Sequence, residues 1–129
     1  MNEVISIIPD DAPTLKTNLE PELPVTITPE EFFKVDLRVG QVLAAARVPK
    51  STKLVRLQVS FGNFERQILA GVGLTYEPGD LVGQSYVFVV NLPSRKMMGL
   101  ESHGMMLAAG EPEALSLLKT YVSVGSRLG

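Results

Sequence analysis

The sequence has 129 residues, of which 45% are hydrophobic, enough for one domain with a buried core. It has no cysteine, which excludes disulfides, thiolate nucleophiles and cysteine-based zinc sites. The absence of any run of about 18 apolar residues, and the acids near the start of the chain, predict neither a transmembrane helix nor a secretion signal. We therefore expect a cytoplasmic protein.

The net charge of −2 is unevenly distributed along the chain. Residues 1–31 carry seven acids against one lysine, whereas residues 32–129 carry eleven bases against seven acids, a net charge of +4. This excess is compatible with a nucleic-acid partner. It does not require one, because domains that bind nucleic acid through charge alone are more strongly basic.

Residues 1–26 contain four prolines among acids and small polar residues. Frequent proline removes backbone donors and blocks helices, so we interpret this segment as an acidic leader or arm. Two alternatives are open for it: a disordered arm, or a strand that adds to a neighbouring sheet through residues 4–8. The folded domain is expected to span residues 27–129.

A short helix is predicted to begin at Thr28. A threonine N-cap, a proline at the first helical position and Glu31 three residues after the cap have the pattern of a capping box. The apolar side chains that follow, Phe32, Phe33 and Val35, are expected to be buried. The helix should be only one or two turns long, because alternation at period two begins at residue 35.

Alternating apolar and polar residues predict five strands, at residues 35–42, 54–61, 65–70, 85–90 and 105–109. Gly40 suggests a bend or bulge in the first strand, where Leu37, Val39 and Val42 should face inwards. Residues 71–76 should cross the sheet with at most one helical turn, residues 78–80 should form a turn, and residues 115–118 and 121–124 should form a final hairpin. These elements predict an all-β protein with a small, partly open barrel.

Residues 91–105 are expected to connect the fourth and fifth strands as a loop, because Pro93, Gly99 and Gly104 disfavour further sheet. The connection carries polar groups that suit an anionic, hydrogen-bonding partner: Asn91, Arg95, Lys96, Ser102 and His103. The alternative is a solvated loop whose cations keep it soluble.

Four methionines lie in or next to this connection, as the pairs 97–98 and 105–106. Adjacent residues on a strand face opposite sides, so at least Met97 or Met98 could be an exposed, adaptable apolar contact. Packing in the core is the alternative role for these residues.

The sequence gives little support for catalysis. Gly71-Val72-Gly73 resembles part of a dinucleotide-binding loop, but Tyr76 stands in place of the third glycine. Ser102 and His103 are neighbours whose side chains diverge in an extended chain, which disfavours a hydrolytic dyad. A single histidine cannot form a histidine-rich metal site. We therefore expect no cofactor.

A small barrel of this kind can bind nucleic acid across one face. Further cations are expected on the same face as Arg95 and Lys96: Arg38, Lys50, Lys53 and Arg56. Aromatic side chains are scattered, with none in the 91–105 connection. Contacts to backbone, 2′-hydroxyl groups and RNA shape are therefore favoured over recognition of each base.

Several motifs, in order, resemble the tRNA-binding domain family. They are K-V-D-L-R-V-G at 34–40, P-K-S-T-K-L at 49–54, R-Q-I at 66–68 with Gly71, L-V-G at 81–83, and N-L-P-S-R-K at 91–96 with Gly99, Ser102 and Gly104-Met105. This domain is found at the C-terminus of many bacterial methionyl-tRNA synthetases, as a separate β subunit, and as a stand-alone structure-specific tRNA-binding protein. The resemblance runs from about Ile27 to Gly129.

The resemblance implies an OB-fold of five barrel strands with a short N-terminal helix and extra C-terminal strands. It implies a homodimer that binds the tRNA body without reading one anticodon, alone or beside a methionyl-tRNA synthetase catalytic subunit, and that is not an enzyme by itself. The RNA-binding positions of the family fall on Asn91, Arg95, Lys96, Ser102 and Met105, with Lys53 in support.

One alternative is a dimeric chaperone or protein-interaction module on the same OB-fold. A related export-chaperone branch lacks the Gly-Met pair after the serine, so Gly104-Met105 favours the tRNA branch. His103 stands where relatives often carry an acid or an amide. It is expected either to make the loop sensitive to pH or to act as a spacer.

Overall fold

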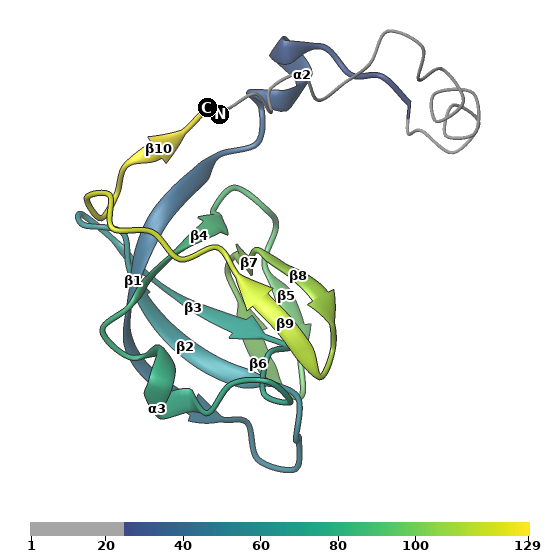
Figure 1. Ribbon diagram of the computed structural model, residues 1–129, viewed down its shortest axis with the longest axis vertical. Helices are drawn as coiled ribbons and strands as arrows, with labels where there is room; N and C mark the ends of the chain where they lie inside the picture. Colours follow the sequence, from purple (N-terminus) through teal and green to yellow (C-terminus); the bar gives the residue numbers. More distant parts are fainter. Residues whose placement is uncertain (1–24) are drawn as a thin grey trace, which may run out of the picture.

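The computed structural model describes residues 25–129 (Figure 1). Its elements, in chain order, are α2 (Pro29–Phe32), β1 (Leu37–Arg47), β2 (Val55–Ser60), β3 (Glu65–Ala70), α3 (Pro78–Leu81), β4 (Ser85–Val89), β5 (Arg95–Met97), β6 (Leu100–Ser102), β7 (Met105–Met106), β8 (Ala108–Glu111), β9 (Ala114–Leu117) and β10 (Arg127–Leu128). The prediction of a mostly β fold with a short N-terminal helix is confirmed. The predicted leader falls almost entirely outside the described residues, and the domain boundary near residue 27 stays a prediction.

The main sheet is antiparallel and has the strand order β3-β2-β1-β4-β7, with β10 paired to the start of β1. Its two end strands, β3 and β7, come into contact as the sheet curls around (Figure 1). The His103 N–H, just before β7, donates to the Gln67 carbonyl of β3 at 2.9 Å. The sheet therefore forms a nearly closed barrel, as predicted.

The inside of the barrel is filled by apolar side chains from strands in which apolar and polar residues alternate along the sequence. In β2, Val55, Leu57 and Val59 are completely buried, and the polar residues between them face away from the core. Phe61, which follows β2, meets Phe88 of β4 edge to face, with ring centroids 5.6 Å apart. This packing makes the barrel a rigid support for the segments that connect its strands.

Gly40 has a different role from the predicted bend. The pairing of β1 with β4 is regular through Gly40, and the irregularity of β1 lies between Val42 and Ala44. A Cβ at Gly40 would lie 2.5 Å from Cγ1 of Val59 and 2.7 Å from Cε1 of Phe61. Glycine at this position allows the core side chains to pack directly against the β1 backbone.

Replacing Gly40 by alanine is expected to destabilise the barrel by about 1–3 kcal/mol, because the added methyl group overpacks the core. Urea denaturation of the purified protein measures this loss. Gly79→Ala is the matched control, because a Cβ at Gly79 meets no atom within 4 Å. Equal midpoints for the two variants would contradict this account of Gly40.

The N-terminal helix confirms its predicted start but not its predicted burial. Thr28 Oγ1 accepts from the Glu31 N–H at 3.1 Å, and Glu31 Oε1 accepts from the Thr28 N–H at 2.8 Å. Phe32, Phe33 and Val35 are nevertheless 41%, 52% and 38% exposed. The prediction that these three side chains are buried is wrong. Within the described residues 25–129, the four-residue helix projects away from the barrel (Figure 1).

The C-terminal strands also pair differently from the prediction. The expected fifth strand is divided into β7 and β8, and β9 pairs with β8 rather than with residues 121–124. The predicted final hairpin is therefore wrong, whereas the expected extra C-terminal strands are present as β9 and β10. The predicted turn at residues 78–80 is instead the start of α3. No helix within residues 25–129 combines the length and the apolar character needed to cross a membrane.

Candidate nucleic-acid interface

The connection between β4 and β7 contains a small β-hairpin rather than the predicted loop. Its strands, β5 and β6, pair Arg95 with Ser102, Lys96 with Glu101 and Met97 with Leu100. The turn residues Met98 and Gly99 have φ values of 52° and 80°. Two successive positive φ values are typical of the type I′ turn that joins tight hairpins. We call this element the β5–β6 hairpin.

The hairpin register places its two cations on opposite faces. Side chains alternate along a strand, so Arg95 and Met97 share one face and Lys96 lies on the other. Lys96 is directly opposite Glu101, whose Oε1 is 3.5 Å from Nε2 of His103. Lys96 therefore shares its face of the hairpin with the Glu101 carboxylate, whereas Arg95 lies on the other face.

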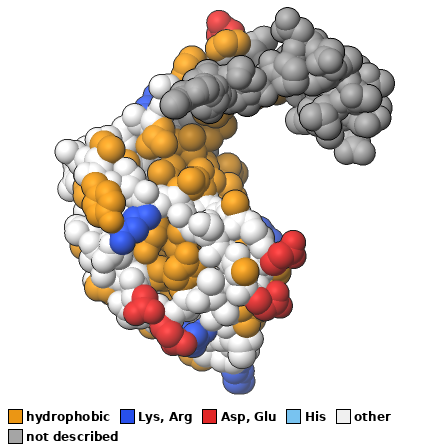
Figure 2. All heavy atoms as spheres, in the orientation of Figure 1, with side chains coloured by type: hydrophobic (Ala, Val, Ile, Leu, Met, Phe, Trp, Pro, Cys, Tyr) orange, Lys and Arg blue, Asp and Glu red, His pale blue; other side chains and the backbone are white. Residues whose placement is uncertain are grey.

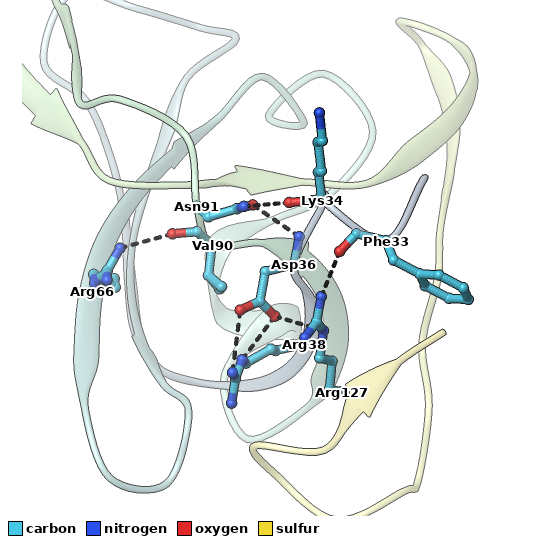
Figure 3. A network of polar contacts seen from close by, with 8 residues as sticks. All are labelled: Phe33, Lys34, Asp36, Arg38, Arg66, Val90, Asn91 and Arg127. Atoms are coloured by element: carbon cyan, nitrogen blue, oxygen red, sulfur yellow. Dashed lines mark hydrogen bonds and ion pairs between the residues drawn. The ribbon is translucent and has the colours of Figure 1, made fainter. Parts of the chain in front are cut away.

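Asn91 anchors the N-terminal end of the connection (Figure 3). Its Oδ1 accepts from the Asp36 N–H at 2.9 Å, and its Nδ2 donates to the Lys34 carbonyl at 2.6 Å. The amide is thus engaged with the segment between α2 and β1. Asn91 fixes the direction in which the chain leaves the barrel towards the hairpin.

Arg66 of β3 holds both ends of the connection together. Its Nη1 donates to the Val90 carbonyl at 3.2 Å and to the His103 carbonyl at 3.1 Å. Figure 3 shows Arg66 beside Val90 at the start of the connection. The guanidinium also lies over the Phe64 ring, 5.0 Å from its centroid. Charge-assisted bonds of this kind are stronger than neutral ones, so Arg66 is a positioning residue for the hairpin.

Ser102 ties the hairpin to the barrel wall. Its side chain is buried, with 3% of the residue exposed. The hydroxyl oxygen accepts from the Leu69 N–H at 2.9 Å, and the hydroxyl donates to the Gly104 carbonyl at 3.1 Å. In this structure Ser102 is therefore a structural contact between β6 and β3.

Asp36 forms ion pairs with two arginines, Arg38 and Arg127 (Figure 3). It accepts from Nε of Arg38 at 2.9 Å and from Nη2 of Arg38 at 3.2 Å, and its Oδ1 lies 3.5 Å from Nε of Arg127. The hydrogen bond and the charge of Asp36 raise the pKa of Arg38 above its ordinary value. Arg38 is thus paired within the protein, and the positive face is smaller than predicted.

A cavity of about 360 Å³ lies between the β5–β6 hairpin, the end of β3 and the segment before β2. It brings together four of the six predicted residues: Lys53, Arg95, Ser102 and Met105. Lys96 does not line it. Within residues 25–129, no group of three His, Cys, Asp or Glu side chains is placed to hold a metal ion. The arrangement, two cations beside an open apolar cavity, is suited to binding an anionic ligand that also has apolar surface.

Comparison with known proteins identifies the family to which the chain belongs. A methionine–tRNA ligase of Methanospirillum hungatei is 42% identical over 119 residues, which are 92% of this chain and 18% of the ligase. A methionine–tRNA ligase of Chloroherpeton thalassium is 52% identical over 103 residues, which are 77% of this chain and 15% of the ligase. The chain thus spans less than a fifth of the length of these relatives.

Two solved structures cover most of the chain. The crystal structure of a MetRS related protein from Pyrococcus horikoshii is 36% identical with a TM-score of 0.78, and the match covers 82% of this chain and 100% of that one. The chaperone CsaA from Bacillus anthracis is 30% identical with a TM-score of 0.73, covering 81% of this chain and 100% of that one. Residues 37–126 match the family described as "Putative tRNA binding domain". The chain therefore belongs to the tRNA-binding domain family.

Proposed function

We propose that this protein binds tRNA by its shape and phosphates, with tolerance for sequence, either alone or as the tRNA-binding part of a methionyl-tRNA synthetase. The observation that carries the proposal is the convergence of Lys53 and Arg95, from two different segments, on one cavity at the edge of the barrel. Cations that a barrel presents next to one another can hold the phosphates of an RNA backbone. Family membership supports tRNA as the anionic partner.

The six predicted residues take two kinds of role in this proposal. Lys53 and Arg95 contact phosphates, and Met105 offers apolar surface between them. Lys96 adds a further phosphate contact from the other face of the hairpin. The two remaining residues, Asn91 and Ser102, hold the hairpin in place through the hydrogen bonds described above. The proposed place of action is the cytoplasm, where tRNA serves protein synthesis.

Fluorescence anisotropy with labelled bulk tRNA tests the proposal. The logarithm of the association constant should fall with the logarithm of salt concentration by roughly 0.7 to 0.9 per phosphate neutralised. An unstructured RNA of equal length is the control for charge alone. Tighter binding of tRNA than of this control supports recognition of shape. Equal affinities, or binding that does not respond to salt, would overturn the proposal.

The protein is further proposed to act as a homodimer. Apolar side chains gather in a stretch that runs from α2 over the start of β1 and the C-terminal segment (Figure 2). Exposed side chains in these segments include Phe33, Tyr121, Val122 and Leu128. An exposed apolar face of this kind, on residues 25–129, is typical of a protein contact. A second copy of the chain would cover it and would place two β5–β6 hairpins in one assembly.

A charge in this face is expected to abolish the dimer. Sedimentation velocity should give twice the chain mass of 14.0 kDa for the parent protein and the single mass for Val122→Asp. Burying an unpaired carboxylate in the interface costs more free energy than the apolar contact contributes. Leu43→Asp is the control, since Leu43 is a similarly exposed apolar residue on β1, away from α2 and the C-terminal segment. A monomeric parent protein at tens of micromolar would contradict the proposed dimer.

A dimeric chaperone or protein-interaction module is the second candidate function. The likeness to the chaperone CsaA and the exposed apolar face favour it. Titration with a reduced, unfolded polypeptide distinguishes the two functions. Salt-insensitive binding of that polypeptide together with weak binding of tRNA would support the chaperone function instead.

A further inference from the structure

The cavity next to Lys53 and Arg95 is more apolar than a phosphate site requires. Its volume is about 360 Å³, near the lower end of the roughly 300–1,000 Å³ found for small-molecule sites. Much of its lining comes from large apolar side chains: Leu54, Leu69, Leu92, Met97 and Met105. Phosphates are held by cations and N–H donors, so these side chains need another explanation.

The polar groups in the cavity divide into two sets. The Ser102 hydroxyl is used within the protein, since it bonds to Leu69 and Gly104. Lys53 and Arg95 are exposed and carry the charge. The cavity therefore offers apolar surface in its interior and positive charge beside it. Its complement is a ligand with an apolar body that fits this volume and a negative group next to that body.

We propose that this cavity receives one unstacked nucleobase of the bound RNA, while the phosphates next to that base contact Lys53 and Arg95. The proposal rests on the proposed tRNA binding and adds to it the feature of RNA that is recognised. A base inside a duplex cannot enter a cavity, whereas a base in a loop can be splayed out of the stack. The protein would thus require an unpaired nucleotide at a fixed place in the RNA.

The chemistry of the walls suits any base. Methionine is flexible, and its sulfur makes favourable contacts with aromatic rings, so Met97 and Met105 can adapt to purines and pyrimidines alike. Every base has a π-face, and packing against that face does not depend on sequence. A cavity of this kind gives selectivity for RNA structure without selectivity for sequence, which is the behaviour proposed above for the whole protein.

Methyl NMR of protein labelled with ¹³C-methyl methionine is the first test. Titration with UMP and with AMP is expected to move the methyl signals of Met97 and Met105 upfield, because a base stacked on them produces a ring-current shift. Met98, exposed at the hairpin turn, and Met106, buried in the core, should not move. Ribose 5-phosphate is the control ligand, since it has the phosphate and the sugar but no base.

The variant Gly71→Leu is the second test. A Cβ at Gly71 would lie 3.0 Å from Cε of Lys53, the flexible end of that side chain, so a leucine there would enter the cavity. We expect tRNA binding to weaken about tenfold, consistent with the loss of one stacked base. Binding to a blunt, fully paired RNA duplex should not change. Gly79→Leu, at an open position in α3, should behave as the parent protein in both assays.

The outcomes separate this inference from the proposed function. Equal methyl shifts with ribose 5-phosphate would overturn the nucleobase site, and so would parental tRNA affinity in Gly71→Leu. Shifts of Met97 and Met105 by an apolar peptide but not by nucleotides would reassign the cavity to protein binding. If Gly71→Leu does not fold, the NMR titration of the parent protein decides. The proposed tRNA binding is tested separately, by the preference of the parent protein for tRNA and by the response of that binding to salt.

Discussion

Alanine at both Lys53 and Arg95 is expected to weaken tRNA binding roughly 40-fold at about 0.1 M salt. When one phosphate contact is lost, about 0.8 fewer counterions are released on binding, and the association constant falls roughly sixfold at this salt concentration. The two side chains lie in one cavity but come from different segments, so each should contribute its own contact. The slope of the logarithm of affinity against the logarithm of salt should decrease in magnitude by about 1.6.

A charge-matched variant provides the control for this experiment. Lys34 and Lys119 are also exposed cations, but neither lines the cavity. Alanine at both positions removes the same net charge and should change tRNA affinity by much less. Anisotropy titrations of both double variants at several salt concentrations make the comparison. Equal losses in the two variants would mean that net charge, rather than this site, determines the binding.

Replacing Arg66 by methionine is expected to lower the free energy of unfolding by about 3–6 kcal/mol. Hydrogen bonds to charged groups contribute about 1.5–3 kcal/mol each, and the Arg66 guanidinium makes two, to the Val90 and His103 carbonyls. Methionine keeps much of the apolar packing on Phe64 but cannot donate. The hairpin should then open more often, and tRNA affinity should fall because Arg95 is no longer held in place.

Urea denaturation and hydrogen exchange measure this effect. The His103 amide, which donates to Gln67, should exchange faster in Arg66→Met than in the parent protein. Arg56→Met is the control, since Arg56 is an exposed arginine on the neighbouring strand, and surface changes of this kind usually stay within about 0.5 kcal/mol. If both variants unfold at the same urea concentration, Arg66 is not the residue that positions the hairpin.

Local patterns predicted the parts of the fold that depend on neighbours in sequence. The Thr28 and Glu31 capping box needs only four consecutive residues, and the alternation of β2 predicts its buried face directly. The prediction that Phe32 and Phe33 are buried is wrong, because an apolar pattern does not show whether the surface that buries the side chains belongs to the same barrel. Their exposure is now one of the observations behind the proposed dimer.

The candidate site was only partly predictable, because its geometry depends on distant contacts. Family resemblance pointed to Asn91 and Ser102, but the hydrogen bonds that tie them to the rest of the barrel reach partners 57, 55 and 33 residues away in the chain. Arg66 was missed as a positioning residue for the same reason. Met98-Gly99 lacks the Asn-Gly or Asp-Gly signature of a type I′ turn. Without that hairpin, the opposite orientations of Arg95 and Lys96 could not be inferred.

The most direct test of the central claim is to map tRNA onto the protein by NMR. Backbone amide signals of ¹⁵N-labelled protein should shift on addition of tRNA at residues 50–54 and 91–105, around the cavity and the β5–β6 hairpin. Signals of residues 121–128, on the exposed apolar face, should stay unchanged. Shifts concentrated at residues 121–128, with none around Lys53 and Arg95, would show that the interface lies elsewhere.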